Sequence, residues 1–100
     1  MSEAICELCG NISPLEALEI HHIVPVEVTE PAGISRPATA SLCHNCHQEV
    51  HEWYDRNIST VAYRPESKSF QPKSPDEMAK EYEGAYRVFT QFKKAQRDGD

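Results

Sequence analysis

The sequence predicts a small α+β domain held together by a metal site, with an amphipathic helix at its C-terminal end. Three observations predict it: two Cys-x-x-Cys pairs, two short apolar segments between them, and apolar residues at helical steps near the end of the chain. A chain of 100 residues forms one domain. Because a domain of this size buries only a modest core, a bound metal is a natural source of added stability.

The four cysteines form two closely spaced pairs, Cys6 with Cys9 and Cys43 with Cys46. Gly10 follows the first pair and can take the positive φ that closes a tight turn around a metal. Two disulfides are the alternative use of four cysteines. Residues 1–20 contain no lysine or arginine, so we expect no secretory signal, a cytoplasmic location and reduced thiols. The pairs then predict one structural Zn²⁺ bound by four thiolates.

Two segments between the cysteine pairs are predicted to form an antiparallel hairpin. Residues 17–24 are rich in apolar side chains and end at Pro25, and residues 38–42 form a shorter second strand. Residues 25–37 contain three prolines and Gly33, so we predict a long loop there.

A helix is predicted over residues 45–56, where Cys46 and Val50 stand at helical spacing with either Trp53 or Tyr54. A cysteine turn, a hairpin and a helix that carries the second cysteine pair follow one another in a treble-clef zinc finger. The start of the helix favours this use, because its unpaired N–H groups stabilise thiolate charge.

The C-terminal part is predicted to be a second helix joined by a linker. Residues 63–74 are polar and hold two prolines, and Ser74 to Glu77 form a capping box with proline at the first helical position. We therefore divide the chain into a core of residues 1–62, a linker of residues 63–74 and a helix of residues 75–97 packed on the same domain. The apolar stripe expected to enter the core is Met78, Tyr82, Ala85, Tyr86, Phe89 and Phe92.

The histidines suggest a second metal site. His47 and His51 are four residues apart on the predicted helix, so their rings share a face and can hold one ion. Either His21 or His22 can add a ligand from the strand, which leaves the other as a general base. Neighbours on a strand point to opposite faces, so a twist or bulge is expected there. The alternatives are surface histidines, or a Cys₃His zinc site that uses His47; His44 is expected to face solvent.

Two segments carry a family resemblance. Glu19-Ile-His-His-Ile-Val-Pro25 and Leu42-Cys-His-Asn-Cys-His-Gln-Glu-Val-His51, preceded by Cys-x-x-Cys-Gly, resemble the HNH endonuclease family. The resemblance is greatest to the zinc-stapled, stand-alone HNH proteins of phage and restriction-type systems, and it covers about residues 5–55. It implies a ββα-metal fold, in which one divalent ion lies between a hairpin and a helix, and a bacterial or phage-encoded protein.

The resemblance also implies roles for individual residues. His22 matches the general base of the family. The ligands of the catalytic ion are matched by His21, His47 and His51. The structural zinc ligands are matched by Cys6, Cys9, Cys43 and Cys46. Three imidazoles favour Mn²⁺, Co²⁺ or Ni²⁺ at least as strongly as Mg²⁺. Ala38 stands where the family usually has an asparagine that braces the loop and orients the base. The implied activity is metal-dependent nicking of DNA, with low sequence specificity, by a monomer or weak homodimer.

The charge balance argues against tight non-specific DNA binding. The chain has 10 lysines and arginines against 16 aspartates and glutamates, a formal charge of −6. Arg36, Arg56 and Arg64 are the predicted contacts to DNA, and Lys93, Lys94 and Arg97 near the C-terminal end are further candidates. The alternatives are a non-catalytic treble-clef module that binds nucleic acid or protein, and a thiol oxidoreductase. No apolar run is long enough to predict a membrane span.

Overall fold

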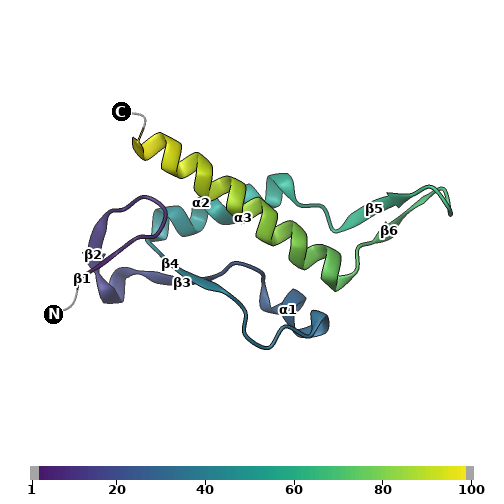
Figure 1. Cartoon of the computed structure of the whole chain (residues 1–100), viewed down its shortest axis with the longest axis horizontal. Coiled ribbons are helices and arrows are strands. Elements are labelled where there is room, and N and C mark those ends of the chain that lie inside the picture. The colour runs from purple at the N-terminus through teal and green to yellow at the C-terminus, as the bar shows by residue number, and fades with distance from the viewer. Residues whose placement is uncertain (1–2, 99–100) are drawn as a thin grey trace.

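The computed structural model describes residues 3–98 and shows a small α+β fold, which confirms the predicted class (Figure 1). Within these residues, three α-helices are combined with three two-stranded antiparallel sheets. The elements in chain order are β1 (Glu3–Ile5), β2 (Ile12–Pro14), the 3-10 helix η1 (Leu15–Ala17), β3 (Glu19–His22), α1 (Val26–Ala32), β4 (Thr39–Leu42), α2 (His44–Asn57), β5 (Val61–Arg64), β6 (Ser69–Pro72) and α3 (Pro75–Asp98).

The central hairpin is formed by β3 and β4, as predicted. The strands pair without interruption from Glu19 opposite Leu42 to His22 opposite Thr39, so the bulge expected at the histidine pair is absent. The buried face of β3 carries His21, which is 1% exposed, whereas Ile20 is 62% exposed. This strand therefore turns a polar side chain inward and an apolar one outward, the reverse of the usual alternation.

The prediction of a loop over residues 25–37 is wrong, because α1 lies within it. Pro31 lies inside α1, where it cannot donate a backbone hydrogen bond to the Glu27 carbonyl oxygen, and the helix ends at the next residue. Gly33 then adopts a left-handed conformation with φ 76°, and the Ile34 N–H donates to the Thr29 carbonyl oxygen. Together with the bond from the Gly33 N–H to the Glu30 carbonyl oxygen, this bond forms a Schellman cap. The helix packs against α3.

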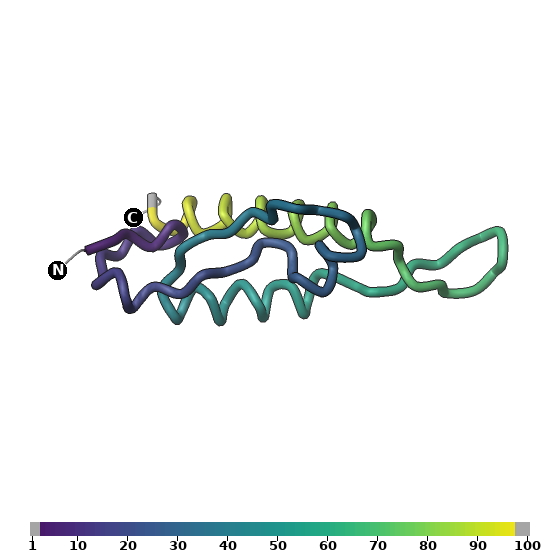
Figure 2. Tube along the Cα trace, turned by 90° about the horizontal axis from the view of Figure 1, so that it is seen from below, coloured from purple at the N-terminus to yellow at the C-terminus, as the bar shows by residue number. Residues whose placement is uncertain are grey.

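Residues 63–74, predicted as a linker, contain most of the β5–β6 hairpin, which projects from one end of the molecule (Figure 2). The molecule measures 56 × 33 × 16 Å. Its radius of gyration is 15.9 Å, compared with about 13 Å for a compact domain of this length. The projecting hairpin accounts for much of this elongation.

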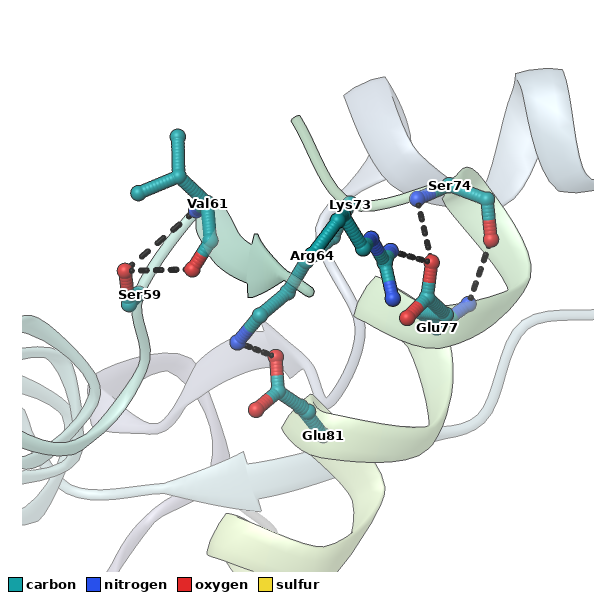
Figure 3. A network of polar contacts seen from close by, with 7 residues as sticks. All are labelled: Ser59, Val61, Arg64, Lys73, Ser74, Glu77 and Glu81. Carbon is teal, nitrogen blue, oxygen red and sulfur yellow. Dashed lines mark hydrogen bonds and ion pairs between the residues drawn. The ribbon is translucent and has the colours of Figure 1, made fainter. Parts of the chain in front are cut away.

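Ion pairs join Arg64, at the turn end of β5, and Lys73, just after β6, to the first two turns of α3 (Figure 3). Arg64 Nη2 lies 2.7 Å from Glu77 Oε1, and Lys73 forms an ion pair with Glu81. The predicted capping box is confirmed: the Glu77 N–H donates to Ser74 Oγ, and the Ser74 N–H donates to the Glu77 carboxylate. Both basic side chains are thus paired with carboxylates of α3.

The core lies where α2 and α3 pack against the β3–β4 hairpin and the cysteine turn. Trp53 packs on Phe89 with ring centroids 5.4 Å apart, and Tyr54 packs on Tyr82 at 4.8 Å. Phe92 was predicted to enter the core but is 48% exposed, because it stacks on the outer side of Trp53. The buried core cluster is Cys6, Leu8, Ala40, Leu42, Cys46, Val50, Tyr54 and Phe89. Among residues 3–98, the helices are all too short or too polar to cross a membrane.

Candidate metal centres

The two cysteine pairs come together as predicted and form a compact four-sulfur cluster. Their sulfur atoms all lie within 4.8 Å of one another, and Cys9 Sγ is 3.8 Å from Cys43 Sγ. All four are free thiols. A tetrahedral Zn²⁺ with Zn–S bonds of about 2.3 Å would separate its sulfur ligands by about 3.8 Å. The cluster therefore fits a structural zinc site.

Short local hydrogen bonds shape the turn that carries Cys6 and Cys9. The Gly10 N–H donates to the Cys6 carbonyl oxygen, and Gly10 takes the predicted positive φ, 78°. The Glu7 N–H donates to the Ser41 carbonyl oxygen, and the Ser41 N–H donates to Glu7 Oε2 at 2.6 Å. These two bonds hold the first cysteine pair against β4, directly before the second pair.

The thiol pKa values show why the cluster suits a cation. Burial opposes ionisation of Cys6, but N–H groups of Cys9, Cys43 and Leu8 outweigh it and lower the thiol pKa to about 6. Burial raises the pKa of Cys46 strongly, and the neighbouring thiols raise it further. Four thiolates cannot share this space without a positive charge among them, and a divalent metal provides it.

Three histidines form the second cluster: His21 from β3, and His47 and His51 from successive turns of α2. One ring nitrogen from each lies within 4.8 Å of the others, and the two Nε2 atoms of His47 and His51 are 3.1 Å apart. Metal–nitrogen bonds of about 2.0–2.1 Å place ligand nitrogens roughly 2.9–3.4 Å apart. The cluster can therefore hold one divalent ion. Because His47 groups with the histidines, the alternative Cys₃His arrangement is not the one the fold assembles.

Glu19 supports this cluster, and the sequence analysis missed it. Its Oε1 lies 2.7 Å from His47 Nδ1, and its Oε2 lies 3.2 Å from His44 Nδ1. Hydrogen bonds from His47 and then His44 lower the pKa of the Glu19 carboxyl. An ionised carboxylate accepts a hydrogen bond from the Nδ1–H of His47, which leaves the Nε2 lone pair free for a metal. The available signal was position: Glu19 and His21 stand two apart and share a strand face.

The environment keeps the buried histidine neutral. Burial, and then the neighbouring imidazoles of His51, His47 and His22, lower the pKa of His21 to about 4. Burial and then His47 also lower the pKa of His51, although Asp55 opposes them. A metal binds imidazole only in its neutral form, so these shifts favour metal binding at neutral pH.

An open pocket of about 490 Å³ adjoins the cluster. The cluster histidines, His22, Glu27 and Asp55 are among the residues that line it. His22 is exposed and reaches the pocket without a bulge in its strand. The Ala38 carbonyl oxygen accepts the Ile23 N–H at 3.2 Å. This bond extends the pairing of the two strands by one residue beyond His22 and Thr39.

The predicted DNA contacts lie outside this pocket. Arg36 is exposed before β4, and Arg56 is exposed in the last turn of α2. Arg64 lies on the projecting hairpin and is paired with Glu77. His44 faces solvent as predicted, with 66% of its side chain exposed.

No protein-family model, curated protein or solved structure matches this chain. The described residues form an α+β domain with a four-cysteine group fit for structural zinc and a separate group of three histidines beside an open pocket.

Proposed function

We propose that this protein is a divalent-metal-dependent DNA endonuclease of HNH type that hydrolyses phosphodiester bonds one strand at a time. The observation that supports it is the convergence of His21, His47 and His51 beside an open pocket that His22 also lines. A closed four-ligand metal site serves folding, whereas three protein ligands leave coordination positions open for water or substrate. The chain has one group of each kind.

His22 has the role of general base in this proposal. It lines the pocket from the exposed side of β3, where it can take a proton from the water that attacks phosphorus. His21, His47 and His51 would hold the ion, and Glu19 would fix the His47 ring. A divalent ion held there supplies the positive charge that stabilises the developing charge on the phosphate oxygens.

Nicking of supercoiled plasmid DNA tests the proposal. The purified protein is incubated with plasmid and with Mn²⁺, Co²⁺, Ni²⁺ or Mg²⁺, and we expect nicked circles with at least one transition ion. His22→Ala should lower the rate by about 10²–10⁴ while the protein keeps its metals. The control is Gln48→Ala, an exposed residue beside His47 on α2, which should nick at the wild-type rate. Wild-type nicking by His22→Ala would rule out its role as the base.

A non-catalytic treble-clef module that binds protein or nucleic acid is the second candidate. The acidic side chains of Glu27 and Asp55 at the pocket favour the protein-binding form of this module, because they repel a phosphate group. Metal analysis separates the two functions. One tightly bound zinc together with a second, exchangeable ion supports the nuclease, whereas one zinc per chain and no cleavage with any ion supports the binding module.

A further inference from the structure

Tyr54 connects the histidine cluster to the interior of the domain. It stands on α2, one turn after Val50, and is 4% exposed. Its hydroxyl oxygen lies 3.2 Å from His21 Nε2 and 2.8 Å from the carbonyl oxygen of Ile23. Both partners are therefore within hydrogen-bond distance of one phenol group.

The number of protons decides the direction of both bonds. A phenol has one proton to donate, and a carbonyl oxygen can only accept. The Tyr54 hydroxyl therefore donates to Ile23, as its shorter contact indicates. The contact with His21 is then a hydrogen bond only if Nε2 of His21 carries a proton and donates it to the Tyr54 oxygen.

A neutral imidazole has one protonated nitrogen and one lone pair. With the proton on Nε2, the lone pair of His21 is on Nδ1. We propose that Tyr54 is a positioning residue that makes His21 bind the ion of the histidine site through Nδ1. This inference rests on the proposed metal site, but it concerns the choice of nitrogen rather than the reaction.

The site would then use two kinds of imidazole donor. Glu19 accepts a hydrogen bond from the Nδ1–H of His47, which leaves Nε2 as the ligand atom on α2. The Tyr54 oxygen accepts a hydrogen bond from the Nε2–H of His21, which leaves Nδ1 as the ligand atom on β3. The two supporting residues thus select opposite nitrogens on the two elements that meet at the ion.

Packing holds the His21 ring in this orientation. Tyr86 stacks on it with ring centroids 5.7 Å apart and an interplanar angle of 28°, and His21 is almost fully buried. The Tyr54 ring is itself held edge-on by Tyr82 at 4.8 Å. Reversal of the His21 ring would place a carbon atom against the Tyr54 hydroxyl, so the hydrogen bond opposes reversal.

Nitrogen NMR of the wild-type protein tests the inference without any mutation. Histidine is labelled with nitrogen-15, and the His21 resonances are assigned by their loss in His21→Asn. In the zinc-loaded protein without a second ion, we expect the proton of His21 on Nε2. After cadmium-113 is added to the histidine site, we expect its coupling to Nδ1 of His21. A proton on Nδ1, or coupling of cadmium to Nε2, would overturn the inference.

Two variants give an independent measurement. Tyr54→Phe removes only the hydroxyl and should weaken binding of Co²⁺ at the histidine site by about 10–100-fold, as loss of a supporting partner does. Tyr63→Phe makes the same chemical change on the projecting hairpin, away from the residues that line the pocket, and it should leave Co²⁺ affinity unchanged. Equal affinity of wild type and Tyr54→Phe would also overturn the inference.

The outcome for the proposed nuclease is separate. If no plasmid is nicked but cadmium couples to Nδ1 of His21, the role of Tyr54 stands and the endonuclease proposal fails. If plasmid is nicked but cadmium couples to Nε2, the endonuclease proposal stands and the role of Tyr54 fails.

Discussion

Leu42→Ala, compared with Ile20→Ala, tests which face of the central hairpin is buried. Leu42 is 0% exposed at the end of β4, directly before Cys43, whereas Ile20 on the paired strand is 62% exposed. By hydrophobicity alone, both aliphatic residues would be assigned to the core. The structure buries His21 in place of Ile20, so the two truncations should differ clearly.

The expected difference follows from burial. Truncation of leucine to alanine removes about three methylene groups at about 0.8 kcal/mol each, and the remaining cavity raises the loss of unfolding free energy to about 3 kcal/mol. At roughly 4–8 °C per kcal/mol, the melting temperature should fall by about 12–24 °C. Ile20 has only about a third of its surface buried, so its truncation should cost less than about 1 kcal/mol.

Thermal unfolding in excess Zn²⁺, followed by circular dichroism, measures both variants with the cysteine site filled. Equal losses, or a greater loss for Ile20→Ala, would refute the reasoning. Because a shift of one residue exchanges the two faces of a strand, such a result would place Ile20 inside and His21 outside. The histidine cluster could not then form as described.

Three further predictions concern the metal sites. Glu19→Gln should weaken Co²⁺ binding at the histidine site by about 10–100-fold, as measured by calorimetric titration. Glu16→Gln, at an exposed position, is the control. Equal Co²⁺ affinities of the wild type and Glu19→Gln would contradict the role of Glu19. Cys46→Ser should lose zinc and unfold the domain, because structural zinc contributes on the order of 10 kcal/mol to the free energy of folding. A variant that is zinc-loaded by mass spectrometry and folded by circular dichroism would refute this. With no ion at the histidine site, His21 has a pKa of about 4 in the folded protein, below its ordinary value of 6.5. Between pH 4 and pH 6.5, His21 is therefore protonated in the unfolded chain but neutral in the folded protein. Urea titrations should therefore show stability falling as the pH is lowered from about 6.5 toward 4, with a shallower fall in His21→Asn; identical slopes would contradict it.

The sequence was sufficient to predict the ligand groups, because their spacing reflects chemistry rather than packing. The cysteine pairs can serve one metal only if a hairpin and a helix bring them together, and the structure has both elements. Val50 and Tyr54 are buried in the core at the helical spacing expected, and the alternative residue, Trp53, is partly buried and packs on Phe89 at the edge of the core. Each cysteine pair and each helical stripe consists of residues close together in the chain, so it can be recognised in the sequence.

The missed features depend on distant contacts or on proline. α1 was not predicted because Pro31 lies inside it, and proline disfavours a helix interior. The β5–β6 hairpin was hidden by Pro65 in its turn and Pro72 at its end. Glu19 is close to the histidine pair in sequence, but its partner His47 is 28 residues away. No local pattern reports such a contact.

The projecting β5–β6 hairpin is the part of the structure that could pair with another chain in concentrated solution. Tyr63 and Phe70 pair across its strands with ring centroids 5.5 Å apart, and they are 53% and 70% exposed. Within residues 3–98 each of these strands pairs only with the other, so the outer edges of the ribbon are open to another chain. Pro72 at the end of β6 and the charge of Lys68 at the turn are the kinds of residue that discourage such pairing. Substitutions in the β5–β6 hairpin should therefore change the solubility of the protein more than the stability of its fold.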